Sequence, residues 1–149
     1  MKKSVVVFIG ALLLLAVAGL VACGQSQNLP EPAVDLPVAL GSFTQVKYGY
    51  DPDLGDYQYQ FKLTNTQQIE FQKLLQADQW FDPGELPGRG YTPVIDADDG
   101  QGWNLTVGYW DEAHTLIGLY SDDQDEKIFY FAPFEVQEAA GKFRDKLEK

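Results

Sequence analysis

The chain has 149 residues, 45% of them apolar, which is enough material for one folded domain and little more. Its 22 acidic residues outnumber 11 lysines and arginines, so the net charge is −11. Because a protein that binds phosphates needs a basic surface, we predict no nucleic-acid partner.

The first 23 residues are typical of an export signal, which must be set aside before the fold is considered. Lys2 and Lys3 form a basic start, and residues 5–22 form an almost unbroken apolar run. The run ends in four residues that fit one motif: Leu20, Val21, Ala22 and Cys23. This tetrad resembles the lipobox of bacterial lipoproteins. The resemblance implies that residues 1–22 are a signal peptide, cleaved before Cys23, and that a diacylglycerol is joined to the Cys23 thiol.

An uncleaved transmembrane anchor is the alternative, because an apolar run of about 18 residues can span a bilayer. Small residues at the end of the run and the single cysteine at the expected place favour the lipoprotein. In both cases residues 24–149 lie outside, because the positive charge stays in the cytoplasm. We therefore predict a lipid anchor at the extracytoplasmic face of the cell membrane, where two acyl chains make a durable attachment.

Residues 23–41 are expected to be a flexible tether that carries the lipidated cysteine. Pro30, Pro32 and Pro37 occur within eight residues, and no lysine or arginine is present that could bind lipid head groups. Such a chain extends at about 3 Å per residue, so its reach is at most about 50 Å. Loss of residues 1–23 removes two lysines and no acidic residue, so the exported part carries a charge of −13.

Residues 42–149 have the length of one domain. Strict alternation predicts a strand over residues 56–64, with aromatic and apolar side chains on one face and polar side chains on the other. A weaker strand at 43–50 precedes it, and an acidic hairpin loop joins the two. A helix capped by Asn65 then runs to about Ala77.

A loop rich in proline and glycine follows at residues 82–93. Four short strands then come at the spacing of antiparallel hairpins: residues 94–97, 103–110, 115–121 and 127–131. A second helix, about residues 133–148, has an apolar stripe, Pro133 in its first turn and basic residues near its end. The expected fold is α+β: an antiparallel sheet of five to six strands in the order β-β-α-β-β-β-β-α, with both helices packed on one face.

This layout resembles small uncharacterised lipoproteins of Gram-positive bacteria, including those with a YhfM-like domain. The resemblance is carried by a strand, a helix ending near Trp80, a proline and glycine loop, further strands and a charged closing helix. It covers most of the exported chain and implies no known activity.

The sequence offers no nucleophilic triad. His114 is the only histidine, in the predicted loop 111–114. A catalytic histidine needs a nucleophile and an orienting partner, but the exported serines, Ser26, Ser42 and Ser121, lie outside any Gly-x-Ser-x-Gly motif. A solvated loop histidine is therefore expected. Since one histidine does not supply a zinc site either, we predict no catalytic residue, no metal and no cofactor.

Three acidic clusters crowd predicted loops: Asp51, Asp53 and Asp56; Asp96, Asp98 and Asp99; and Asp122, Asp123, Asp125 and Glu126. Aspartate favours turns because it bonds its own backbone, and this is the expected role. Calcium binding is an alternative, but the stretch from Asp96 to Gly100 is one residue short of the usual loop. A glycosidase with two carboxylates about 5 to 10 Å apart is another, and the sequence nominates no pair.

Aromatic residues give the one candidate ligand site. Trp110 lies on the polar face of the predicted strand 103–110. If it is exposed, Trp110 with Tyr91 or Tyr120 would form a platform for sugar or peptide recognition. A tryptophan at such a position more often covers the sheet or meets a loop, and we expect that arrangement.

The sequence therefore predicts a membrane-anchored extracytoplasmic lipoprotein that is not an enzyme. Its domain would be a binding or accessory module for an envelope component or a secreted protein. Two other classes stay open. One is a small hydrolase of cell-wall polymers that uses loop carboxylates. The other is an inhibitor or immunity-like protein whose acidic loops fit a basic partner.

Overall fold

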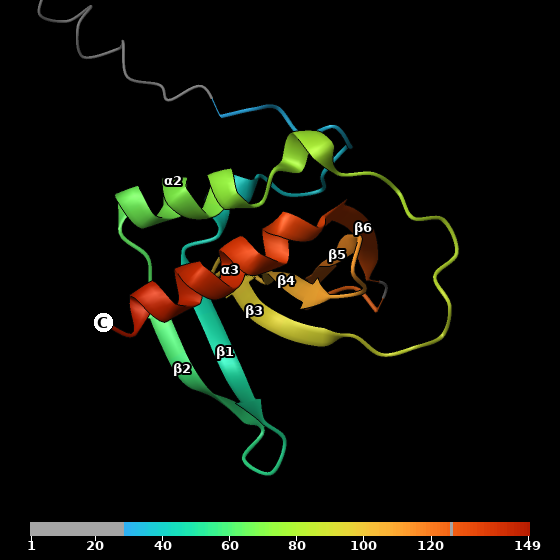
Figure 1. The fold of residues 1–149 in the computed structure, drawn as a ribbon. Coiled ribbons are helices and arrows are strands. Elements are labelled where there is room, and N and C mark those ends of the chain that lie inside the picture. Colours follow the sequence, from blue (N-terminus) through green and yellow to red (C-terminus); the bar gives the residue numbers. More distant parts are fainter. Residues whose placement is uncertain (1–28, 126) are drawn as a thin grey trace, which may run out of the picture.

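The computed structural model describes residues 29–125 and 127–149 (Figure 1). In chain order the elements are η1 (Leu40–Ser42), β1 (Gln45–Asp51), β2 (Asp56–Lys62), α2 (Asn65–Leu74), η2 (Ala77–Gln79), β3 (Thr92–Asp98), β4 (Trp103–Tyr109), β5 (His114–Ser121), β6 (Ile128–Pro133) and α3 (Phe134–Leu147). The predicted α+β class and the predicted order of strands and helices are confirmed. The predicted signal peptide, its predicted cleavage motif and Cys23 lie outside the described residues.

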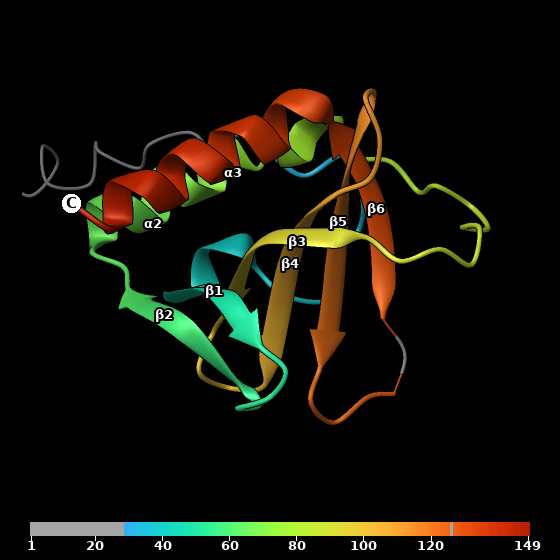
Figure 2. The same cartoon turned by 60° about the horizontal axis from the view of Figure 1, so that its bottom comes forward.

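All six strands form one sheet in the order β2-β1-β3-β4-β5-β6, and every neighbouring pair is antiparallel. Short hairpins join β3 to β4, β4 to β5 and β5 to β6. The connection from β2 to β3 carries α2 and passes over β1. Both helices lie on the same side of the sheet, as expected (Figure 2). The other side, which we call the open face, carries no helix.

The core lies between the sheet and the helices. Helix α3 packs against β3, β4 and β5, and α2 packs beside α3. Phe71 of α2 and Phe143 of α3 meet with ring centroids 5.7 Å apart. Below them lie fully buried aliphatic side chains of the central strands: Ile95, Leu105, Val107, Ile117 and Leu119. Because side chains alternate along a strand, the residues between these point to the open face.

The helix ends differ from the prediction by a few residues. Thr64, not Asn65, caps α2: its side chain accepts a hydrogen bond from the Gln67 N–H, and the Gln67 side chain accepts one from the Thr64 N–H. The helix ends at Leu74, and Gln76 then adopts a left-handed φ of 48°. Pro133 is extended and ends β6, so it precedes the first turn of α3.

Residues 33–41 are not a flexible tether, and the packed unit begins near Ala33 instead of residue 42. The Ala33 N–H donates to the Ala77 carbonyl at 2.9 Å, and the Tyr130 hydroxyl donates to the Asp35 carbonyl at 3.0 Å. Every second side chain packs against the core: Val34, Leu36, Val38 and Leu40. This period of two is typical of an extended, half-buried segment, and the prolines around it do not prevent packing.

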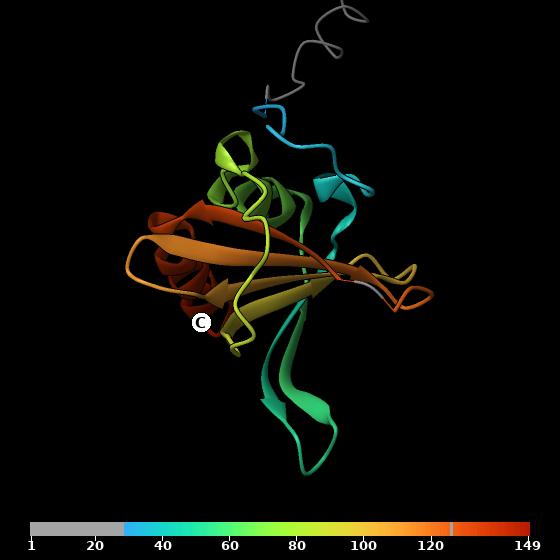
Figure 3. The ribbon, with the colours of Figure 1, turned by 90° about the vertical axis from the view of Figure 1, so that its right-hand side faces the viewer.

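The β1–β2 hairpin projects from the body of the sheet and is bent (Figure 3). Its register pairs Tyr48 with Tyr59 and Tyr50 with Tyr57, but the pairing is interrupted between them, where Gly49 has φ +69°. A left-handed conformation suits glycine and locally disrupts a ladder. Tyr57, beyond this bend, reaches the open face, so the predicted alternation over residues 56–64 is wrong at this residue.

Candidate functional site

A carboxylate lies in the middle of the open face. Asp96 belongs to β3, between Ile95 and Ala97, which face the core, and it is only 8% exposed. Burying a charged group is costly unless hydrogen bonds compensate. Asp96 lies in the predicted strand 94–97, so its grouping with the loop aspartates is wrong, because its apolar neighbours on the strand fix its direction.

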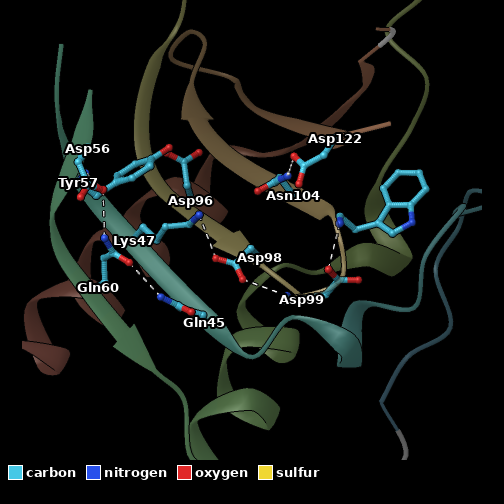
Figure 4. A network of polar contacts seen from close by, with 12 residues as sticks. Gln45, Lys47, Asp56, Tyr57, Gln60, Asp96, Asp98, Asp99, Asn104 and Asp122 are labelled. Carbon is cyan, nitrogen blue, oxygen red and sulfur yellow. Dashed lines mark hydrogen bonds and ion pairs between the residues drawn. The ribbon is translucent and has the colours of Figure 1, made fainter. Parts of the chain in front are cut away.

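Two hydroxyl groups donate hydrogen bonds to the Asp96 carboxylate. The Tyr57 hydroxyl donates to Oδ2 at 2.9 Å, and the Thr106 hydroxyl donates to Oδ1. Thr106 is the register partner of Asp96 on β4, whereas Tyr57 reaches over from β2 (Figure 4). Lys47, the register partner of Asp96 on β1, holds its ammonium 5.3 Å from the centre of the Tyr57 ring. Side chains of β2 and β4 thus bond one carboxylate on β3, and Lys47 of β1 lies beside one of these partners.

Three tyrosines gather around this carboxylate. Burial, followed by the negative charge of Asp96, raises the pKa of Tyr57, of Tyr91 and of Tyr120. The pKa of Tyr120 reaches about 12. These phenols are protonated at neutral pH; the hydrogen of Tyr57 is engaged by Asp96. We call these residues the tyrosine-aspartate cluster: Tyr57, Tyr91, Asp96, Thr106 and Tyr120.

Small residues on the central strands make room for the rings. A Cβ atom on Gly108 would lie 2.6 Å from Cδ2 of Tyr91, so the ring of Tyr91 occupies the space above this glycine. Gly118 similarly faces the ring of Phe129, with 3.3 Å between its notional Cβ and the ring. The rings of Tyr91 and Phe129 meet edge to face at 6.2 Å. The open face therefore changes from polar at β1 and β3 to aromatic at β5 and β6.

A hollow of about 300 Å³ adjoins the cluster on the open face; we call it the polar hollow. It is lined by Lys47, Asp98, Gly100, Gly102, Trp103, Asn104 and Asp122. The Lys47 ammonium pairs with Asp98 Oδ2 at 2.9 Å, and Asn104 Nδ2 donates to Asp122 Oδ1 at 2.9 Å (Figure 4). A larger hollow, about 640 Å³, lies between residues 29–41 and the end of α2.

The structure brings together two of the three predicted ligand residues. Tyr91 and Tyr120 both belong to the cluster, and the negative charge of Asp96 contributes to the raised pKa of each. Trp110 does not join them. It is 8% exposed, under the Arg89 guanidinium, whose carbon lies 4.1 Å from the ring centre. The expectation that Trp110 meets a loop is confirmed, and a platform that includes an exposed Trp110 is wrong.

His114 is the first residue of β5 and is partly buried, so a freely solvated loop position is wrong. Its ring stacks on Phe131 at 4.7 Å, and Nδ1 lies 3.2 Å from Asp111 Oδ1. Burial acts to raise the pKa of Asp111, but hydrogen bonds from the Ala113 and His114 N–H groups and the nearby ring hold this pKa below its usual value. Within the described ranges no serine hydroxyl bonds to His114.

The expected turn role of the aspartates is confirmed at several loops. Asp51 Oδ1 accepts hydrogen bonds from the N–H groups of Asp53 and Leu54. Asp99 Oδ1 accepts from the N–H groups of Gln101 and Trp103. Among residues 29–125 and 127–149, no group of three or more histidine, cysteine, aspartate or glutamate side chains is arranged to hold a metal ion.

Sequence reasoning missed Asp96 as a functional candidate, together with its partners Tyr57, Lys47 and Thr106. One signal was present in the printed sequence: Asp96 is a charged residue between apolar neighbours of a predicted strand. Such a residue in a half-buried strand needs a partner on the same face. Thr106 comes from the next strand across a hairpin, whereas Tyr57 lies 39 residues away, and no local pattern indicates that Tyr57 is a partner.

The comparisons with known proteins found no match: no family model, no curated protein and no solved structure is significantly similar to this chain. The resemblance to lipoproteins with a YhfM-like domain therefore stays a prediction.

Proposed function

We propose that this chain is a membrane-anchored extracytoplasmic lipoprotein whose domain is a non-catalytic binding module for an envelope component. The supporting observation is the tyrosine-aspartate cluster on a sheet face that no helix covers. Phenols and carboxylates of this kind fix the orientation of a polar ligand, while the neighbouring rings offer it apolar contact.

Anchoring is supported by the lipobox-like tetrad that ends in Cys23. Within the described ranges, neither α2 nor α3 has the length and apolar character needed to cross a bilayer.

A hydrolase of wall polymers is the second candidate, and one observation favours it. Asp96 and Asp98 lie two residues apart on one strand, so their Cα atoms are about 7 Å apart, which suits a carboxylate pair. Both side chains are already engaged, however: Asp96 with Tyr57 and Thr106, and Asp98 with Lys47. A general acid or base needs a free position facing its substrate, so the binding role is better supported.

Retention of envelope material by the full-length chain tests this function. The chain is immobilised and incubated with purified wall polymer and with proteins released from the envelope. We expect the wild type to retain one of these components and Asp96→Asn to retain much less, because the variant changes the hydrogen bonding of the cluster. Asp123→Asn, an exposed change outside the cluster, should retain as much as the wild type.

Release of new reducing ends from the wall polymer is followed in the same incubation. Retention without release supports a binding module. Release that continues over time and disappears in Asp96→Asn would establish the hydrolase instead. Equal retention by all three chains would contradict a role for the open face.

A further inference from the structure

The polar hollow combines donors and acceptors in one place. The Lys47 ammonium has three N–H groups, and its pairing with Asp98 occupies one of them. On the opposite side, the bond between Asn104 Nδ2 and Asp122 Oδ1 leaves Asn104 Oδ1 and Asp122 Oδ2 with free lone pairs. A ligand in this hollow therefore meets unused donors on one side and unused acceptors on the other.

Charge limits what the hollow can accept. Asp98 and Asp122 contribute carboxylates to the lining, so an anionic ligand is repelled. Lys47 lies among them and disfavours a bare cation. A neutral hydroxyl group fits both sides, because it donates one hydrogen bond and accepts others. The lining therefore matches a compound that carries several hydroxyl groups.

The shape of the hollow agrees with a small ligand. Its volume of about 300 Å³ lies at the lower end of the range for small-molecule sites, about 300 to 1,000 Å³. Gly102 has φ +106°, a conformation that favours glycine, so this part of the lining carries no side chain. The hollow suits a short saccharide that lies along the sheet.

We propose that the polar hollow binds a neutral saccharide unit, held by hydrogen bonds from Lys47 and to Asn104 and Asp122. This inference rests on the proposed binding function and names the class of its ligand. Tyr120, the register partner of Asn104 on β5, connects the hollow to the tyrosine-aspartate cluster. A longer glycan would thus continue from the hollow over the aromatic part of the open face.

Calorimetric titration of the full-length chain tests the proposal. The chain is kept in a zwitterionic detergent without a sugar head group and titrated with disaccharides of glucose, galactose, mannose, N-acetylglucosamine and glucuronate. We expect at least one neutral disaccharide to bind more tightly than the glucuronate one. Asp122→Ala should weaken its binding about tenfold, since a charged acceptor is lost.

Asp123→Ala is the matched control, because Asp123 is the next residue, is exposed and does not line the hollow. Thermal unfolding of each variant shows that the fold is kept, and Asn104→Ala gives a second change in the lining. Absence of binding by every neutral disaccharide, or equal weakening by Asp122→Ala and Asp123→Ala, overturns the proposal. Retention of envelope material through Asp96 without saccharide binding overturns this inference alone and leaves the proposed function standing.

Discussion

Asp96 shows how one residue can organise a face of the sheet. Its carboxylate is nearly buried and is satisfied by hydroxyl groups of Tyr57 and Thr106. Because an unsatisfied buried charge is costly, either hydroxyl contributes to stability by keeping the carboxylate bonded. The same charge acts on Tyr91 and Tyr120 and makes their phenols harder to ionise.

Tyr120 should therefore ionise late. Burial and the charge of Asp96 raise its pKa to about 12 in the folded chain, whereas an unfolded tyrosine has a pKa of about 10. The stability that comes from the protonated phenol is complete below pH of about 10 and is lost as the pH rises towards 12. Absorbance of tyrosinate, followed against pH in wild type and Tyr120→Phe, should differ by one group with a midpoint near 12. A difference curve centred near 10 would contradict the assignment.

At the scale of elements, the sequence predicts what local patterns control. Periods of two and 3.6 residues indicated the six strands, the two helices and their order, and hairpin spacing indicated the antiparallel pairing. The start of the first helix differs by one residue from the prediction, because Thr64 and Asn65 can both cap a helix and Thr64 does so here. Residues 33–41 were misjudged because three prolines outweighed the alternation of Val34, Leu36 and Val38.

The segment before β1 should contribute measurably to stability. Leu40 is 8% exposed and belongs to the core, so Leu40→Ala should lower the free energy of unfolding by about 2–3 kcal/mol. Leu54→Ala makes the same chemical change at a side chain that is 78% exposed and should cost less than about 0.5 kcal/mol. Urea unfolding of the full-length variants measures both. Equal values would mean that this segment is not part of the cooperative unit.

The candidate site could be predicted only in part, because tertiary structure assembles it. Tyr91 and Tyr120 were named from their aromatic character, and both lie near Asp96 in the fold. The bend at Gly49 that turns Tyr57 towards Asp96, and the Arg89 side chain that covers Trp110, are contacts between distant residues. Alternation along one strand does not contain this information.

On the scale of the whole molecule, the net charge and the proposed lipid anchor would act together. Under the proposed export, residues 24–149 carry a charge of −13 and are repelled by an anionic membrane surface within the screening length of about 8 Å. Residues from Ala33 onward pack against the domain. If Cys23 carries the lipid, the intervening stretch reaches at most about 30 Å. The domain would then be held close to the bilayer without lying on it.

The anchor itself can be tested by metabolic labelling with a palmitate analogue. The wild-type chain should incorporate the label, and Cys23→Ser should not. The resemblance to a lipobox implies that the diacylglycerol, with both acyl chains, is joined to the thiol of Cys23, which the variant lacks. Antibody detection of total chain controls for expression. Labelling that persists in Cys23→Ser, or a wild type without label, would show that the chain is not a lipoprotein of this class.

The bend in the β1–β2 hairpin has a consequence for many copies crowded on one surface. A straight, unpaired edge strand can template a strand of another chain and start a fibril. Here the ladder is interrupted at Gly49, and Phe131 on the opposite edge is already bridged by Phe81. Because the hairpin is bent, β2 is not the straight template that a fibril needs, and the Phe81 bridge occupies backbone groups of β6, so crowding of copies is not expected to start amyloid-like growth.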